Sequence, residues 1–131
     1  MSVLNREEIL DADDIVMELV SVPEWGGDVW VKGITGKARD EWEAGIVSTT
    51  GKSTTVNMRN VRAKLCAISI CDDEKKLLFT PSDIKELSGK SAAPLQRCFV
   101  VAQRLSGLTD DDVEELAEAL NDNPLEDSAS D

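Results

Sequence analysis

The pattern of apolar and polar positions begins with two strands joined by a turn. Residues 15–22 and 29–34 are rich in β-branched side chains, and the pair Gly26-Gly27 lies between them. β-Branched side chains favour strands, and glycine tolerates the positive φ that a tight reversal of the chain needs. The pattern therefore predicts a β-hairpin near the N-terminus.

The register of this hairpin depends on the length of its turn. If the glycine pair forms the two central positions, Val22 pairs with Val31 and Pro23 with Trp30. Proline then lies near the turn, where its missing backbone donor matters least. A longer loop over residues 23–28 is the alternative.

Beyond the hairpin, apolar residues recur with the 3.6-residue period of amphipathic helices. Thr35 can cap the first of these helices, in which Trp42 and Ile46 lie one turn apart. The same spacing in "VNMRNVRAKLCAISI" favours a helix there over a strand. The predicted helices cover about residues 36–47, 56–70, 81–88, 92–106 and 110–122.

The third predicted helix has the clearest start signal in the chain. Thr80 is a suitable N-cap, Pro81 takes the first helical position, and Asp83 stands where a capping-box acid belongs. Phe79 and Ile84 occupy the two positions of a hydrophobic staple. These signals predict that a helix begins at residue 81.

Apolar stripes along the helices are predicted to build the core. Leu65 lies centrally on the stripe of the second helix, and Phe99 lies centrally on that of the fourth. A stripe of this kind normally faces the interior of a small domain. The last predicted helix carries its own stripe of apolar residues, Val113, Leu116, Ala117 and Leu120.

The three cysteines are predicted to be small buried hydrophobes in a reducing compartment. Cys66, Cys71 and Cys98 are odd in number and contain no C-x-x-C pair. The chain has no histidine, which removes the commonest general base and the commonest metal ligand. We therefore expect no catalytic residue, no metal site and no cofactor.

The stretch Gly51-Lys52-Ser53 is similar to the end of a phosphate-binding loop. Such a loop needs the spacing G-x-x-x-x-G-K-[ST] between a buried strand and a helix, so that backbone N–H groups surround the phosphates. The first glycine would have to be residue 46, which is Ile46. Residues 48–55 are instead predicted to be a mobile polar loop whose Ser53 or Thr54 caps the next helix. A small nucleotide-binding enzyme or regulator using Lys52 is the alternative function.

Composition indicates one globular domain with an acidic end. The chain has 131 residues, of which 41% are hydrophobic and 31% charged, and its formal net charge is −12. Residues 110–131 hold 10 acidic and no basic residues. This charge argues against binding to nucleic acid or to an anionic membrane surface, and no run reaches the ~18 apolar residues of a membrane span.

These patterns predict an α+β fold in which an N-terminal β-hairpin is followed by a bundle of about four to five helices, so that helix predominates. Residues 1–12 are predicted to form an N-terminal arm and residues 13–122 a single globular domain. Residues 123–131 have too little apolar content to fold and are predicted to be a disordered acidic tail.

Three blocks of the sequence, taken in order, resemble the tail assembly chaperones of long-tailed bacteriophages and prophages. The blocks are "SVPEWGGDVWVKGITGKARDEWE", "RAKLCAISICDDEKKLLFTPSDIKEL" and "GKSAAPLQRCFVVAQRLSGLTDDDVEEL". The resemblance runs from about Val22 to Leu116. It implies a small, non-catalytic, self-associating protein of the host cytoplasm that is absent from the finished virion.

The resemblance also implies the partners, which are the tape measure protein and the tail tube protein. In many phages a longer form of the chaperone is made by ribosomal frameshifting near its C-terminus. We expect the binding surface to use apolar parts of the hairpin and of the C-terminal helices. The candidate protein-binding residues are Trp25, Trp30, Phe99, Leu116 and Leu120.

Overall fold

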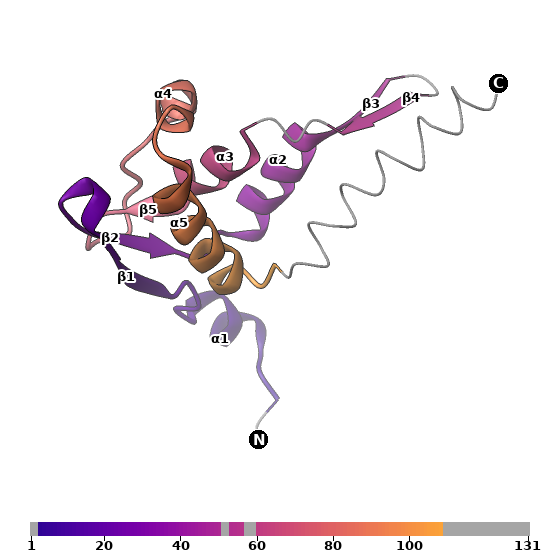
Figure 1. Ribbon diagram of the computed structural model, residues 1–131. Coiled ribbons are helices and arrows are strands. Elements are labelled where there is room, and N and C mark those ends of the chain that lie inside the picture. Colours follow the sequence, from indigo (N-terminus) through magenta and orange to yellow (C-terminus); the bar gives the residue numbers. More distant parts are fainter. Residues whose placement is uncertain (1–2, 51–52, 57–59, 109–131) are drawn as a thin grey trace.

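The computed structural model of the protein describes residues 3–50, 53–56 and 60–108. Within these residues the fold is α+β, as predicted, and the N-terminal hairpin is confirmed (Figure 1). The elements in chain order are α1 (Arg6–Asp11), β1 (Met17–Val22), the 3-10 turn η1 (Pro23–Trp25), β2 (Gly27–Lys32), α2 (Gly36–Ile46), β3 (Val47–Thr50), β4 (Ser53–Val56), α3 (Val61–Ala67), β5 (Ile70–Cys71), the 3-10 turn η2 (Pro81–Asp83), α4 (Ile84–Ser88) and α5 (Ala92–Leu105).

The centre of the fold is a three-stranded antiparallel sheet in the order β1-β2-β5. Successive side chains of a strand point to opposite faces. Val20, Val22 and Val31 are buried on one face, which we call the inner face, and α5 contacts β1 and β2 from this side. Leu19 lies on the opposite, outer face and is 49% exposed. The helices therefore cover one face of the sheet.

The two-residue turn predicted for the hairpin is wrong. Val22 pairs with Gly27, so the loop spans the four residues 23–26. The alternative of a longer loop, over residues 23–28, is closer to the observed loop. Pro23 opens the 3-10 turn η1, and the Gly26 N–H donates to the Pro23 carbonyl at 3.0 Å. Gly26 has a φ of +84°. Of the two glycines in the pair, only Gly26 has the left-handed conformation, and Gly27 begins β2.

Helix α2 confirms the first predicted helix and its cap. The Thr35 hydroxyl oxygen accepts the Ala38 N–H at 3.0 Å, and Trp42 and Ile46 are both buried. The helix then passes directly into β3, which pairs with β4 in an antiparallel hairpin from Val47↔Val56 to Thr50↔Ser53 (Figure 1).

This second hairpin corrects the polar loop predicted for residues 48–55. Ser53 and Thr54 lie in a strand and do not cap a helix. The reason is that residues 47–56 contain threonine and valine on both sides of Gly51. Their β-branched side chains favour strands, although most of this segment is polar. Gly51 and Lys52 lie outside the described residues.

The second predicted helix is correct at its centre and wrong at its ends. Helix α3 covers Val61–Ala67 with Asn60 as its N-cap, and Ile70–Cys71 form strand β5, paired with Val31 and Trp30. The Ser69 carbonyl also accepts the Lys32 N–H at 2.9 Å. A short apolar run fits a buried helix and a buried strand equally well, so spacing alone could not place this strand.

The start of the α4 region confirms the predicted cap. The Asp83 carboxylate accepts the Thr80 N–H at 2.8 Å, Pro81 is the first residue of η2, and the chain continues into α4. Helix α5 covers most of the fourth predicted helix, and Gly107, at a φ of +74°, follows its end. The fifth predicted helix and the acidic tail lie outside the described residues.

The predicted core positions are confirmed. Leu65 is 0% and Phe99 6% exposed, and both belong to one cluster of buried residues. Cys66, Cys71 and Cys98 are buried free thiols, as predicted. Burial raises the pKa of Cys66 from 9.0 to about 12 and that of Cys98 to about 11. The thiolate, which is the reactive form, is therefore disfavoured at both positions.

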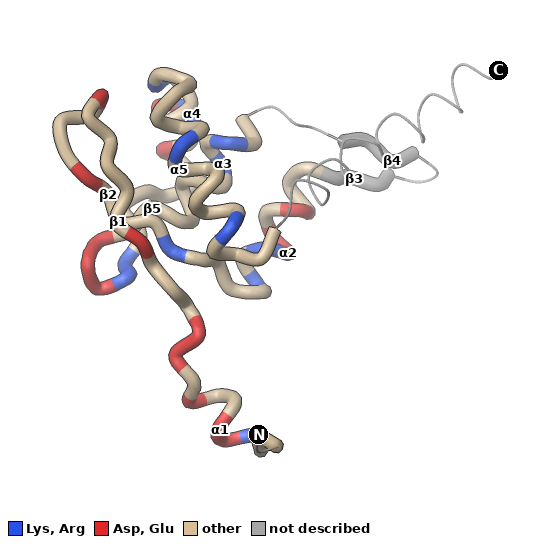
Figure 2. Tube along the Cα trace, turned by 60° about the horizontal axis from the view of Figure 1, so that its bottom comes forward, with Lys and Arg blue, Asp and Glu red and all other residues tan. Residues whose placement is uncertain are grey.

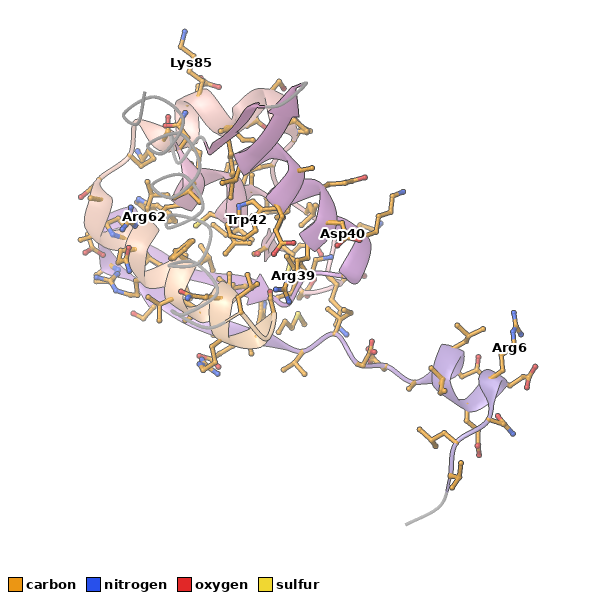
Figure 3. The ribbon with its side chains drawn as sticks, turned by 90° about the vertical axis from the view of Figure 1, so that its right-hand side faces the viewer. Arg6, Arg39, Asp40, Trp42, Arg62 and Lys85 are labelled. Carbon is orange, nitrogen blue, oxygen red and sulfur yellow. The ribbon has the colours of Figure 1, made fainter. Side chains whose placement is uncertain are left out.

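The N-terminal arm extends away from this body. Figures 1 and 3 show α1 and the chain that leads from it to β1 as a projection, with Arg6 far from the other labelled residues. No residue of α1 is buried. Among the described residues, no helix is long and apolar enough to cross a membrane.

Candidate functional site

The structure places the predicted contact residues in different environments. Trp25 lies in the η1 loop and lines an apolar groove, whereas Trp30 lies on β2 and its side chain belongs to the outer face of the sheet. Phe99 is buried, with the Arg62 guanidinium 5.7 Å from the centre of its ring, which argues against its use as a surface contact. The remaining two candidates, Leu116 and Leu120, lie outside the described residues.

The groove at Trp25 has a volume of about 330 Å³ and is mainly apolar. Trp25, Phe79 and Leu87 supply its apolar lining. They come from the β1–β2 loop, from the segment before η2 and from α4, so the groove forms only when the sheet and the helices are assembled. The polar residues that line the same groove are Asp83, Glu86 and Lys90.

An ion pair holds the Trp25 loop against α5. The Arg97 guanidinium donates to both carboxylate oxygens of Glu24, at 2.8 and 2.9 Å, and also to the Ser21 carbonyl at 3.4 Å. A two-pronged pair of this kind fixes geometry better than a single contact does. Hydrogen bonding to Arg97 lowers the pKa of Glu24 from 4.5 to about 2, and the same contact raises the pKa of Arg97. The loop that presents Trp25 is therefore fixed to the helix.

We predict that this ion pair contributes stability only above acidic pH. The folded-state pKa of Glu24 is depressed, so its contribution is present above pH 4.5 and is lost as the pH falls towards about 2. In urea titrations, Glu24→Gln should be less stable than wild type at neutral pH, and the difference should vanish near pH 2. Glu41→Gln is the control for charge removal at neutral pH, because Glu41 forms no ion pair among the described residues and its loss should leave stability unchanged there. A constant difference between Glu24→Gln and wild type at every pH would contradict the prediction.

A second apolar groove, of about 220 Å³, lies where α2, α3 and the α4 region meet. Trp42, Ile68 and Ile84 line it, together with Pro81 of η2. Figure 3 shows Trp42 inside the body of the protein, and its indole Nε1 has no hydrogen-bond partner among the described residues. The η2–α4 segment contributes to both grooves, because Asp83 and Leu87 line the first and the second contains Pro81 and Ile84.

The sequence predicts Trp25 as a contact residue but not the other residues that line its groove. Phe79 and Ile84 were assigned to a staple, and Leu87 was not singled out. One signal in the sequence could have pointed to these residues. It is the occurrence of a helix with a clear N-cap together with a hairpin loop that contains a tryptophan. That signal is too general to specify a groove, because it does not say which elements pack together.

The phosphate-loop alternative is not favoured by the arrangement of the chain. A phosphate loop leads from a strand into a helix, whereas here α2 precedes the segment through β3 and Ser53 begins β4. The central sheet is antiparallel, and "AISICDD" contributes a two-residue edge strand to it. No three His, Cys, Asp or Glu side chains of the described residues are grouped as metal ligands would be.

Comparison with known proteins identifies a shared fold. No protein-family model matches the sequence, and no curated protein matches it. A solved structure, that of the tail assembly chaperone of bacteriophage HK97, superposes with a TM-score of 0.55. The chain shares its fold with this HK97 protein. The match covers 79% of this chain and 95% of the HK97 chain, at 18% sequence identity, so the likeness concerns the fold and not a particular set of site residues.

Proposed function

We propose that this chain is a phage tail assembly chaperone, a non-catalytic protein that binds the tape measure protein and tail tube subunits while the tail is built. The observation that carries the proposal is the apolar groove at Trp25 on a fold shared with the HK97 tail assembly chaperone. The three sequence blocks that resemble such chaperones agree with it. The chain would act in the cytoplasm of the bacterial host and be absent from the mature virion.

The proposed mechanism is temporary cover for apolar helix faces. A tape measure protein is long and largely helical, so its apolar stripes need protection until the tube forms around it. A side chain from such a stripe fits the groove between Trp25, Phe79 and Leu87. The carboxylates of Asp83 and Glu86 line the same groove and suit lysine or arginine residues beside the stripe.

The second groove extends this surface. Helix α4 lines both grooves, with Leu87 in one and Ile84 in the other, so a partner helix bound along α4 would meet both. Anchors at i and i+3 or i+4 positions are the usual contacts of a helix bound in a groove. The acidic C-terminal segment of the sequence would help keep the complex soluble.

We predict that Trp25→Asp abolishes most of the binding. Loss of a buried tryptophan anchor typically costs at least about 2 kcal/mol of binding free energy, which raises the dissociation constant roughly 30-fold. The measurement is co-expression with the tape measure protein of the same phage, followed by titration with a soluble tape measure fragment. Wild type should keep the tape measure protein in solution, and Trp25→Asp should not.

The matched control is Leu78→Asp, which places the same charge on an exposed residue outside both grooves. It should bind like wild type, and circular dichroism should show that both variants are folded. If wild type leaves the solubility of the tape measure protein unchanged, the proposed function is wrong. If Trp25→Asp binds as well as Leu78→Asp, the function can stand but the groove is not its site.

A further inference from the structure

The N-terminal arm, residues 3–16, carries apolar side chains that the rest of the described chain does not cover. Val3 is 96% exposed, and Leu4, Ile9 and Leu10 are each more than half exposed. Leu4 and Ile9 occupy the positions of a hydrophobic staple around the N-cap of α1. Figure 3 shows this helix well separated from the body of the protein.

Helix α1 is nevertheless capped as a structural element. The Asn5 side-chain oxygen accepts the Glu8 N–H at 2.9 Å, and the Glu8 carboxylate accepts the Asn5 N–H at 3.0 Å. At the C-terminal end of the helix, the Ala12 N–H donates to the Ile9 carbonyl. A helix of six residues is marginal in water by itself. Its caps and its free apolar side chains therefore suit an element that packs against a surface outside its own domain.

The outer face of the sheet offers such a surface. In antiparallel sheets, residues directly opposite one another point to the same face. Leu19 lies opposite Trp30, Trp30 lies opposite Cys71, and Cys71 forms a bridge with Leu77. These four residues form an apolar row across the sheet, which we call the outer row. Its two ends, Leu19 and Leu77, are 49% and 44% exposed.

The arm is acidic, and basic side chains lie at one end of the outer row. Residues 7–14 contain five acidic and no basic residues, and Figure 2 shows the acidic positions along the arm. On the outer face, the charged neighbours of Trp30 along β2 are Asp28 and Lys32. Lys32 lies opposite Met17, at the end nearer the arm, and its ammonium group donates to the Lys75 carbonyl at 3.0 Å. One contact of this type is already present, because the Lys75 ammonium lies 3.0 Å from the Asp13 carboxylate at the base of the arm.

The base of the arm directs it away from its own outer row. The Gly33 N–H donates to the Val16 carbonyl at 3.0 Å, which continues the β1–β2 pairing by one residue, and the Asp13–Lys75 ion pair holds the chain three residues before Val16. Figures 1 and 2 show the arm leading outwards from this point. To reach its own outer row, the arm would have to reverse its direction before β1 begins. A second copy can be reached without such a reversal.

We propose that the arm of one copy docks on the outer row of a second copy, with Ile9 and Leu10 against Leu19 and Trp30 and the acidic residues of the arm near Lys32. This inference goes beyond the proposed function, because it concerns the chain alone and holds whether or not a tape measure protein is the partner. It leaves the Trp25 groove free, since that groove is lined by η1 and α4 and not by the outer row.

The test uses two full-length variants, each defective in one half of the contact. Ile9→Asp with Leu10→Asp disables the arm, and Leu19→Asp disables the outer row. Val100→Asp is the control, because Val100 is a similarly exposed apolar residue on α5. In sedimentation equilibrium, self-association should weaken at least about tenfold in each defective variant, which corresponds to about 1.4 kcal/mol. Val100→Asp should associate like wild type.

Mixing the two defective variants gives the decisive result. The intact arm of Leu19→Asp can dock on the intact outer row of the arm variant, so a 1:1 mixture should recover a hetero-complex that neither protein forms alone. A mixture that stays monomeric while wild type associates would overturn the proposal, as would wild-type association by either variant alone. A wild type that is monomeric at all concentrations with arm amides protected from hydrogen exchange would show docking within one copy, which also overturns it.

A second measurement covers the possibility that Leu19→Asp misfolds. Leu10→Cys and Leu19→Cys are mild changes at exposed positions, and the native thiols are buried. Mixed under oxidising conditions, the two proteins should form a disulfide-linked heterodimer, whereas Leu10→Cys mixed with Val100→Cys should not. Equal cross-linking in both mixtures would overturn the proposal. None of these assays contains a tape measure protein, so their failure would leave the proposed function untouched.

Discussion

Replacing Leu65 by alanine should destabilise the protein by roughly 2–5 kcal/mol, a large part of the 5–15 kcal/mol that holds a typical domain together. Leu65 is 0% exposed and lies in α3, which packs against both α5 and α4. Truncation removes apolar contacts and leaves a cavity that the surrounding helices and sheet can only partly close. Phe99→Ala should have an effect of similar size, because its ring lies in the same cluster.

Urea denaturation followed by far-ultraviolet circular dichroism measures this loss. Leu78→Ala is the control for Leu65→Ala, because Leu78 is the same residue type at 55% exposure, and its substitution should change the free energy of unfolding by no more than about 0.5 kcal/mol. An unfolding midpoint for Leu65→Ala that matches Leu78→Ala would mean that the α3 stripe does not lie in the core.

The features predicted correctly from the sequence are those determined by neighbours in the chain. The Thr35 cap depends on Ala38, three residues away, and the Thr80 cap depends on Asp83 in the same way. Burial of Leu65 and Phe99 follows from a helical period that is visible in a window of about two turns. Such signals need no knowledge of how the elements pack together.

The features that were missed depend on partners far away in the sequence. Strand β5 forms because Ile70 and Cys71 pair with Val31 and Trp30 of β2, about forty residues earlier in the chain. Without those partners the same run has a helical pattern. The hairpin register was predicted wrongly for a different reason. Pro23 favours a 3-10 turn, which lengthens the loop and leaves Gly26 as the one left-handed residue within it.

The residues of the candidate site also divide into those predicted from local sequence and those that depend on the fold. Trp25 was proposed from the sequence as an apolar residue of the hairpin, but its groove needs Phe79 and Leu87 from segments that only the fold brings near it. The outer row was also hidden, since it joins Leu19 to Leu77 through two intervening strands. Trp25 and Trp30, which sequence analysis assigned to one surface, thus belong to two surfaces that we propose to have different partners.

At the junction between the sheet and α5, a single added methyl group should be poorly tolerated. Gly33 follows β2, its N–H donates to the Val16 carbonyl, and the next N–H, from Ile34, donates to the Ser106 hydroxyl oxygen at 3.0 Å. These two hydrogen bonds tie both the start of β1 and the end of α5 to one short segment. A Cβ on Gly33 would lie 2.6 Å from the Leu105 carbonyl oxygen, a backbone atom that cannot rotate away.

We therefore expect Gly33→Ala to destabilise the protein by roughly 1–3 kcal/mol or more, the usual range for overpacking, because either the end of α5 or the end of β2 must move. For a domain of this size, each kcal/mol lowers the melting temperature by roughly 4 °C. Gly45→Ala, near the end of α2, is the control of opposite sign. Among the described residues, no atom beyond its chain neighbours and its own helix backbone lies within 4 Å of the added Cβ. Gly45→Ala should therefore stabilise the protein by about 0.4–1 kcal/mol, because alanine lowers the conformational entropy of the unfolded chain. Calorimetric melting of both variants measures the difference, and a Gly33→Ala protein as stable as Gly45→Ala would mean that the sheet and α5 are not in contact at this point.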